Sequence, residues 1–438
     1  MNTATTGAMG PPPAEPPAGY QPAQSRSLLN YAKHADFMVF LGWTISTTLP
    51  VGFLGPLRYL AAAYFAGAFL LFARQVSPAV ARCWPLFLLP ILCTISAIWA
   101  PSMNEALRKG FSLALTALVA IYVATRIPGR KILLAYFLAE LIAAVISLRT
   151  NTIDSQGAWT GMFGQKNFFA VNMFILYVAA LGLILDRENG RWIRRVAMAG
   201  APLALLLVVL AKSGTTTLLV LATTAAMLGQ TLVWQPASKI PNARALIVMG
   251  FAVVGLLGAY VAFGILQIDL MKEVLGALGK DSTLTGRTML WELAERSMAE
   301  HPWTGLGANG YWRVEHGMAN SITAILQGAE RFSSFSFHNA YYENGVSYGY
   351  PGYWATVILS TWACASAGMN WARNQTAVNA AFLMFALMIV LRSTSEADLS
   401  EEFRAMVVIL FVSASRKELH LKPQRQPGGG ATFWRAGA

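Results

Sequence analysis

Long apolar runs recur along most of this chain, and many of them approach the length that crosses a lipid bilayer. A hydrocarbon core about 30 Å thick needs roughly 20 apolar residues per helix. Of the 438 residues, 55% are hydrophobic and only 12% are charged, whereas an average soluble domain has about 25% charged residues. These patterns predict an all-α polytopic membrane protein.

The apolar runs predict about twelve transmembrane helices within a membrane domain of residues 36–415. Residues 1–35, which open with a Pro/Ala/Gln-rich stretch, are predicted to form a disordered tail, and residues 416–438 a second tail. We expect no cleavable signal peptide. The predicted spans are 37–54, 59–73, 84–100, 110–126, 132–148, 167–185, 196–211, 215–234, 244–266, 346–367, 378–392 and 403–415.

The basic residues predict the orientation. Most of the 33 Lys and Arg residues fall in the two tails and in the even-numbered loops. Because cytoplasmic loops carry an excess of Lys and Arg, both termini are predicted to be cytoplasmic. The charges are scattered over many loops without a folded basic domain, so nucleic-acid binding is the weaker interpretation of the +12 net charge.

The loop of residues 267–337 is the one extramembrane segment predicted to be large enough to build a site, and this orientation places it on the outer side of the membrane. Its residues 285–299 have a helical pattern, with one stripe formed by Leu290, Trp291, Ala294 and Met298. Arg287 lies at the N-terminal end of this stripe. We therefore expect Arg287 to point at the membrane interface or into a cavity.

Two other features of the sequence have structural interpretations. The glycines at 305, 307 and 310 predict an irregular turn; a phosphate-cradling loop is a weak alternative, because no strand precedes them and no Lys-Ser/Thr follows. The three cysteines lie within or beside apolar runs without paired spacing, which is typical of packing residues.

Short motifs follow one another along residues 90–400 in a fixed order: SAIW before Pro101, GMF running into Lys166-Asn167, GRTMLWE and EHPWTGLG over 286–307, HNAY at 338–341 and GYPG at 349–352. Together they resemble the O-antigen ligase and polysaccharide polymerase superfamily. The amino-acid sequence of residues 286–307 is most similar to that of exopolysaccharide polymerases of the succinoglycan type. One departure is Lys212-Ser213-Gly214-Thr215, where many members carry an arginine after the seventh span.

The resemblance implies a helical membrane bundle of the glycosyltransferase C type and a donor linked to undecaprenyl diphosphate. It implies an acceptor that is a second lipid-linked repeat in polymerases or lipid A-core in ligases, and no metal ion. We expect no cofactor, and we expect a chain-length regulator as a further partner. The sequence also lacks an Asp-x-Asp pair typical of metal-dependent sugar transfer.

Transfer of a sugar from a glycosyl diphosphate needs cations for the leaving group, a base for the acceptor hydroxyl and alignment of the reacting atoms. Arg suits phosphate because its planar fork binds two oxygens at once. Arg287 is the predicted diphosphate ligand, and His338 the predicted base or orienting group. The further predicted substrate-binding residues are Lys212, Lys166, Asn167, Asn339 and Glu396.

Each assignment has a structural alternative. Arg287 could form a helix-terminal salt bridge, for instance with Asp281, and His338 could belong to an aromatic interface belt. Lys212 could be a snorkelling anchor. The acidic group around Glu396 could be a solvated, internally paired loop between Arg392 and Arg404.

The leading hypothesis is thus a metal-independent membrane glycosyltransferase that polymerises lipid-linked oligosaccharide repeats at the periplasmic face. An O-antigen ligase that transfers glycan to lipid A-core uses the same donor chemistry. A lipid-linked oligosaccharide flippase or transporter is the alternative of a different class, and the sequence shows no pair of matching broken helices that would favour it.

Overall fold

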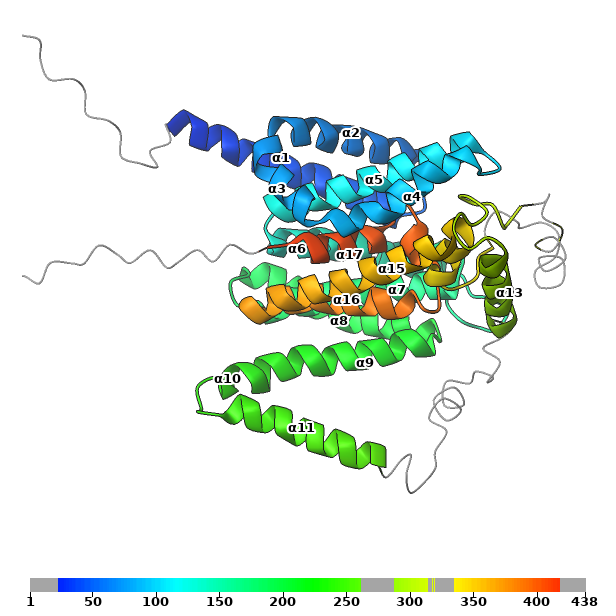
Figure 1. The fold of residues 1–438 in the computed structure, drawn as a ribbon. Coiled ribbons are helices and arrows are strands. Elements are labelled where there is room, and N and C mark those ends of the chain that lie inside the picture. Colours follow the sequence, from blue (N-terminus) through cyan, green and yellow to red (C-terminus); the bar gives the residue numbers. More distant parts are fainter. Residues whose placement is uncertain (1–22, 261–286, 314–316, 318, 320–334, 418–438) are drawn as a thin grey trace, which may run out of the picture.

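The computed structural model describes residues 23–260, 287–313, 317, 319 and 335–417, and these residues form an all-α bundle. Most helices run roughly side by side along one axis (Figure 1). The helices are α1 Ala23–Thr48, α2 Gly55–Leu71, α3 Ala73–Arg82, α4 Leu88–Ile95, α5 Met103–Arg126, α6 Gly129–Thr150, α7 Lys166–Leu185, α8 Arg191–Leu210, α9 Gly214–Gly229, α10 Gln235–Ala237, α11 Ala243–Ala259, α13 Arg287–Glu300, α15 Ala340–Arg373, α16 Ala377–Arg392 and α17 Ala405–Ser415.

Membrane character is confirmed, whereas the number of spans stays a prediction. Among the described residues, 6 helices are long and apolar enough to cross a bilayer. A seventh span would be Ala73–Arg82 joined to Trp84–Ile98, a pair that bends by 83°. The predicted span 84–100 is therefore the second half of this bent pair, and it begins and ends in 3-10 turns at Trp84–Phe87 and Ser96–Ile98.

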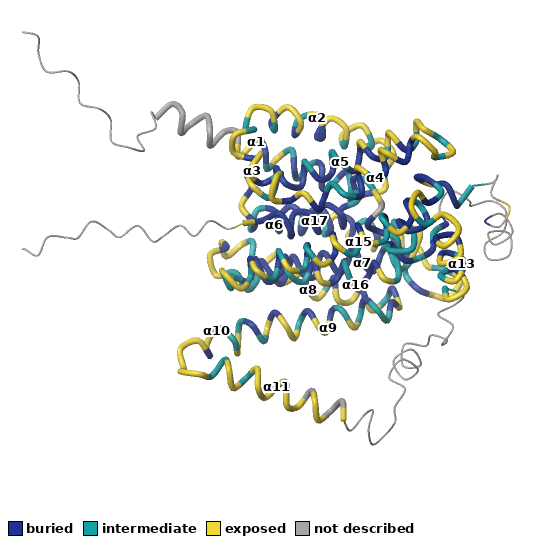
Figure 2. Tube along the Cα trace, in the orientation of Figure 1, coloured by how far each residue is buried: buried dark blue, intermediate teal, exposed yellow. Residues whose placement is uncertain are grey.

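The centre of the bundle is formed by α7 and α17. Both are buried along almost their whole length, and they lie inside the dark blue region of Figure 2. α17 has only 11 residues, about 17 Å at 1.5 Å per residue, which is shorter than a bilayer core. Neighbouring helices surround it, so its uniformly apolar sequence reflects burial in protein. By contrast, α2 and α11 expose large apolar side chains on the outside of the bundle.

α1 begins at Ala23, within the stretch predicted as the N-terminal tail, and the tail boundary at residue 35 stays a prediction. Within the fifth predicted span, Glu140 is fully buried and accepts a hydrogen bond from Thr48 at 3.2 Å. This position inside the bundle is the one expected for a carboxyl group at membrane depth.

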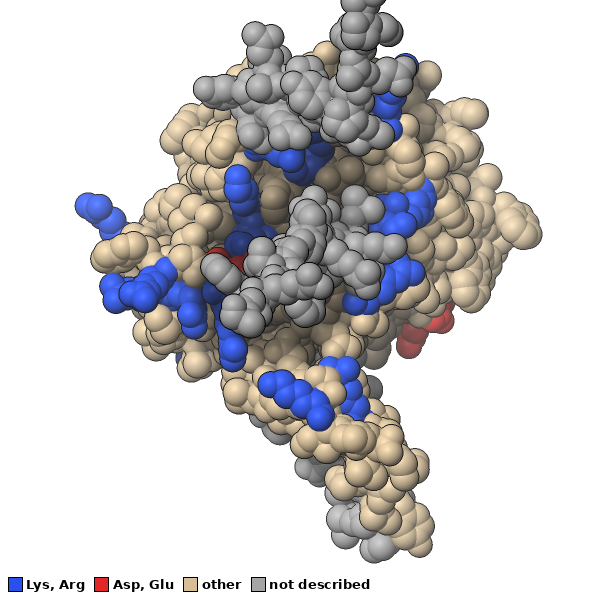
Figure 3. All heavy atoms as spheres, turned by 90° about the vertical axis from the view of Figure 1, so that its left-hand side faces the viewer, with Lys and Arg blue, Asp and Glu red and all other residues tan. Residues whose placement is uncertain are grey.

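The two ends of the bundle differ. One end, where α5 ends and α6 and α8 begin, is rich in Lys and Arg and shows few acidic groups (Figure 3). The opposite end carries α13 and the segment before α15 (Figure 1). The predicted loop 267–337 is therefore represented by α13, by its following turn and by residues 335–337; the rest of it lies outside the described residues.

The glycine-rich turn after α13 packs against a kink in α15. Gly349 has φ +70°, and an added Cβ there would come within 2.5 Å of the Pro302 carbonyl oxygen. The amide of Leu306 donates to Val346 O at 2.9 Å, and that of Tyr350 donates to Pro302 O at 2.8 Å. The tenth predicted span, 346–367, thus begins earlier than expected and changes direction at Gly349.

Candidate functional site

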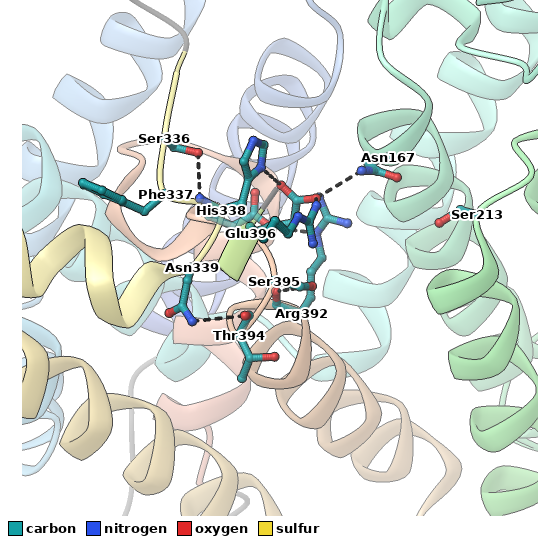
Figure 4. Close-up of polar contacts among 12 residues, drawn as sticks. Asn167, Ser213, Ser336, Phe337, His338, Asn339, Arg392, Thr394, Ser395 and Glu396 are labelled. Carbon is teal, nitrogen blue, oxygen red and sulfur yellow. Dashed lines mark hydrogen bonds and ion pairs between the residues drawn. The ribbon is translucent and has the colours of Figure 1, made fainter. Parts of the chain in front are cut away.

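Four of the predicted site residues, from distant parts of the chain, meet at the α13 end of the bundle. Arg287 Nη2 lies 3.3 Å from Glu396 Oε1, and His338 Nδ1 lies 3.3 Å from Glu396 Oε2. Asn167, on the first turn of α7, donates to Glu396 Oε1 at 3.1 Å. Figure 4 shows His338 and Asn167 approaching the same carboxylate from two sides. We call Arg287, His338, Glu396 and Asn167 the carboxylate cluster.

His338 is held by the segment that leads into α15. It has a left-handed backbone with φ +50°, which is uncommon for a residue other than glycine and persists only where the surroundings impose it. Its amide donates to Ser336 Oγ at 3.3 Å. The preceding carbonyl, of Phe337, accepts a hydrogen bond from Trp291 Nε1 at 3.0 Å. The apolar stripe of α13 therefore fixes the position of the histidine.

Asn339 has a structural role in this arrangement. Its Oδ1 accepts hydrogen bonds from the amides of Tyr341 and Tyr342, at 3.0 and 3.3 Å, and so caps the N-terminus of α15. Its Nδ2 donates to Thr394 O at 3.2 Å. Both ends of the amide are thus engaged within the protein, and a substrate contact by Asn339 stays a prediction.

Glu396 lies in the segment between α16 and α17, which an internal ion pair braces. Arg392 Nε donates to Asp398 Oδ2 at 2.7 Å, and both side chains are buried. The amide of Ala340 donates to Ser393 O at 2.9 Å and joins this segment to α15. The segment does contain internal pairs, but it differs from a solvated loop because Asp398 and Glu396 face the protein.

The electrostatics of the cluster favour an ionised Glu396. Its side chain is only 12% exposed, and this burial by itself raises the pKa. The hydrogen bond with His338 and the charges of Arg392, His338 and Arg287 outweigh burial and hold the pKa of Glu396 below its ordinary value. A carboxylate with three polar partners can therefore orient the imidazole and the guanidinium together.

Lys166 and Lys212 meet at a neighbouring loop and have no direct contact with Glu396 among the described interactions. Lys166 Nζ donates to Gln156 Oε1 at 2.6 Å, and Lys212 Nζ donates to Gln156 O at 3.3 Å. Asp154 lies 3.9 Å from Lys166, and hydrogen bonds from Ala158 and Gln156 together with these lysine charges lower its pKa. Lys166 directly precedes Asn167 of the cluster. Donor contacts by the two lysines stay a prediction.

Other motif residues support the site without joining it. The Trp99 indole donates to Thr304 O at 3.0 Å, and the Ala308 amide donates to Ser96 Oγ at 3.2 Å. The glycine-rich turn is thus packed between α15 and the SAIW motif, which favours a structural role over phosphate cradling. His301 lies at the end of α13 with its side chain exposed. The alternative partner of Arg287, Asp281, and the predicted loop residue His316 lie outside the described residues.

Sequence reasoning missed the Arg392–Asp398 pair as a support for Glu396. The sequence pattern predicts a solvated, internally paired loop for both residues, and the structure has the pair in a buried position. The apolar neighbours Leu399 and Phe403, which are buried, are the signal in the sequence that this segment packs inward. Among the described residues, no group of three or more His, Cys, Asp or Glu side chains is arranged to hold a metal ion.

The fold and the cluster define a polytopic helical membrane protein with an Arg-His-carboxylate site at one end of its helices. The sequence profile of a family described as O-antigen ligase matches residues 199–357. The exopolysaccharide production protein ExoQ of Rhizobium meliloti (strain 1021) is 28% identical over 275 residues. The profile match and the similarity to ExoQ both support the resemblance of this chain to the O-antigen ligase and polysaccharide polymerase superfamily.

The two matches cover only part of the chain, so they include some of the site residues and leave others out. The similarity to the Rhizobium protein covers 61% of this chain and 61% of that protein. The family profile spans Lys212, Arg287 and His338, whereas Asn167 and Glu396 lie outside its limits. Glu396 is therefore connected to the matched region by its contacts in the structure.

Proposed function

We propose that this protein is a membrane glycosyltransferase that joins undecaprenyl-diphosphate-linked oligosaccharide repeats into exopolysaccharide or O-antigen. The observation that carries the proposal is the convergence of Arg287 and His338 on Glu396 at one end of the bundle. The match of residues 199–357 to the O-antigen ligase family and the similarity to an exopolysaccharide production protein support it. The O-antigen ligase reaction, in which lipid A-core is the acceptor, is the second candidate, and the description of the matching family favours it.

The reaction replaces one bond to the anomeric carbon by another. The acceptor hydroxyl oxygen forms a bond to C1 of the donor sugar, and the bond between C1 and the diphosphate oxygen breaks. The diphosphate leaves with the electron pair, and the hydroxyl proton passes to a base. The protein must therefore stabilise a growing negative charge on one side of C1 and accept a proton on the other.

His338 is proposed as the base. When Nδ1 carries a proton, it donates to Glu396 Oε2, and the lone pair of the other ring nitrogen is available to the acceptor hydroxyl. The carboxylate fixes this tautomer and stabilises the imidazolium that forms during transfer. This arrangement of a base oriented by a third group recurs in enzymes that activate hydroxyl groups.

Arg287 is proposed as the diphosphate ligand. A guanidinium has five N–H donors in a fixed fork, so it can pair with Glu396 and with phosphate oxygens at the same time. Lys166 and Lys212 are proposed to add positive charge where the donor enters, and Asn167 and Asn339 to complete the substrate contacts. In this scheme the protein cations neutralise the leaving group, and we propose that the reaction is metal-independent.

The orientation is part of the proposal. The end opposite the site is rich in Lys and Arg (Figure 3), as cytoplasmic loops generally are. We therefore place both termini in the cytoplasm, the carboxylate cluster at the periplasmic face and the protein in a bacterial inner membrane. A chain-length regulator is the proposed partner for control of polymer size.

The test is His338→Ala in a strain that lacks the chromosomal gene, with expression of the tagged protein verified. His301→Ala is the matched control, because His301 lies at the same end of the bundle with its side chain exposed. We expect long polymer to disappear in His338→Ala while single repeats still reach the periplasm, and His301→Ala to keep long polymer.

Other outcomes would contradict the proposal. Long polymer in His338→Ala together with unchanged glycan on lipid A-core excludes the assigned base. Repeats that accumulate on the cytoplasmic side indicate a flippase. Loss of glycan from lipid A-core while long polymer persists indicates a ligase.

A further inference from the structure

A cavity of about 600 Å³ opens next to the carboxylate cluster. It lies where α1 ends, α2 and α7 begin and the segment before α17 passes. Its volume is within the range of small-molecule sites, roughly 300 to 1,000 Å³. Its polar lining includes Arg58, Asn172, Glu401, Glu402 and Arg404.

The cavity shares two walls with the carboxylate cluster. On α7, Asn167 bonds to Glu396, while Phe168 and Asn172 line the cavity. In the segment between α16 and α17, Glu396 belongs to the cluster and residues 401–406 line the cavity. The cavity and the carboxylate cluster therefore adjoin along the first turns of α7 and along the segment before α17.

The polar groups of the cavity are balanced in charge. Two arginines and two glutamates line it, and their formal charges sum to zero. Arg58 and Arg404 supply donors, the two carboxylates supply acceptors, and an amide such as Asn172 can supply both. A phosphate offers acceptors and favours a surplus of cations, whereas a sugar hydroxyl both donates and accepts. The lining thus suits a polyhydroxylated ligand better than an anion.

The polar groups are fixed by aromatic packing. The Arg404 guanidinium carbon lies 4.7 Å from the centroid of the Phe168 ring, and Arg404 Nη2 lies 3.4 Å from Glu401 Oε2. Between Glu402 and Arg404, Phe403 has φ +57°, and its ring contacts those of Trp43 and Tyr59 at 6.3 and 6.1 Å. This strained turn is imposed by tertiary contacts, so the cavity wall is organised before a ligand arrives.

We propose that this cavity binds the sugar chain of the acceptor, with its attacking hydroxyl directed toward His338; the inference rests on the proposed glycosyl transfer. Arg287 holds the donor diphosphate in that scheme, and the acceptor then needs a separate site on the other side of the anomeric carbon. The exposed Arg108, which pairs with Glu402 at 3.7 Å, lies outside the lining of this site.

Binding without catalysis tests the inference independently of the reaction. The probe is the lipid-free repeat oligosaccharide, prepared from the exopolysaccharide of the host, and its affinity for the full-length protein in nanodiscs is measured by calorimetry. We expect Arg287→Ala to bind it within twofold of wild type. Glu401→Gln and Asn172→Leu should bind about tenfold more weakly, the order of change expected for the loss of one hydrogen bond to the ligand.

Glu105→Gln is the matched control. Glu105 is 46% exposed and pairs with Arg313 at 3.3 Å, and Glu401 is 48% exposed and pairs with Arg404 at 3.4 Å. Only Glu401 lines the cavity. The control should bind the oligosaccharide like wild type.

The kinetic arm separates this inference from the proposed function. The concentration of labelled donor is held constant while that of a short-lipid acceptor is varied. The cavity variants should raise KM for the acceptor about tenfold and leave kcat unchanged. His338→Ala should abolish turnover but still bind the oligosaccharide. Unchanged oligosaccharide affinity in both cavity variants would overturn the inference. So would displacement of the oligosaccharide by inorganic diphosphate, which would assign the cavity to an anion.

Discussion

Replacing Glu396 by Gln removes the charge at the centre of the carboxylate cluster and keeps the shape of the side chain. Glu396 lies 3.3 Å from both Arg287 and His338, and its side chain is 12% exposed. A charge-assisted hydrogen bond in such a place contributes about 1.5 to 3 kcal/mol. If that energy stabilises the imidazolium in the transition state, kcat falls about tenfold to about 150-fold.

The same substitution has an opposite consequence for donor binding. Glu396 neutralises Arg287 in the unliganded protein, so its removal leaves more positive charge for the diphosphate. We therefore expect KM for the lipid-linked donor to stay unchanged or to fall in Glu396→Gln. The assay is turnover of purified protein in nanodiscs with defined lipid-linked repeats, compared with Glu105→Gln as a control for loss of an exposed glutamate.

A double-mutant cycle decides whether Glu396 acts through His338. Residues that act as a unit show strongly non-additive effects, so Glu396→Gln should change kcat little in a His338→Ala background. If the two losses multiply, the carboxylate acts independently of the histidine. If Glu396→Gln alone keeps kcat within twofold of wild type, the proposed orientation of the base is refuted.

Three further predictions concern the neighbours of Glu396. Arg287→Lys should raise KM for the donor about tenfold, because an ammonium cannot grip two phosphate oxygens in a plane; an unchanged KM in steady-state assays would contradict this. Asp398→Asn should leave the buried Arg392 without its carboxylate partner and destabilise the protein by about 3 kcal/mol or more. The loss is measured as a lower melting temperature in nanodiscs. Glu401→Gln, which changes an exposed pair, should have the melting temperature of wild type. Because the pKa of Glu396 is lowered on folding, the contribution of Glu396 to stability should be complete above its ordinary pKa of 4.5 and be lost as the pH falls through the lower pKa of the folded state. The melting temperature should therefore depend on pH in that acid range more strongly in wild type than in Glu396→Gln. Equal pH dependence in the two proteins would contradict this prediction.

The sequence by itself determined the class of the fold and most of its helices. The predicted span 167–185 is close to α7, Lys166–Leu185, and the predicted helix 285–299 is close to α13, Arg287–Glu300. Of the predicted stripe on α13, Leu290, Ala294 and Met298 are buried and Trp291 is half-buried. Such features depend on residues a few positions apart, because helical periodicity and apolar length are local properties of the chain.

Only the tertiary structure decided what these residues meet. Arg287 and Glu396 are 109 positions apart, and no periodic pattern links them. The segment around Glu396 has the composition of a solvated loop, yet packing of Leu399 and Phe403 buries the Arg392–Asp398 pair and turns Glu396 inward. The burial of α17 and the cavity beside α7 also arise from contacts between distant helices. Those contacts depend on how whole helices fit together, and local sequence does not encode that fit in a readable pattern.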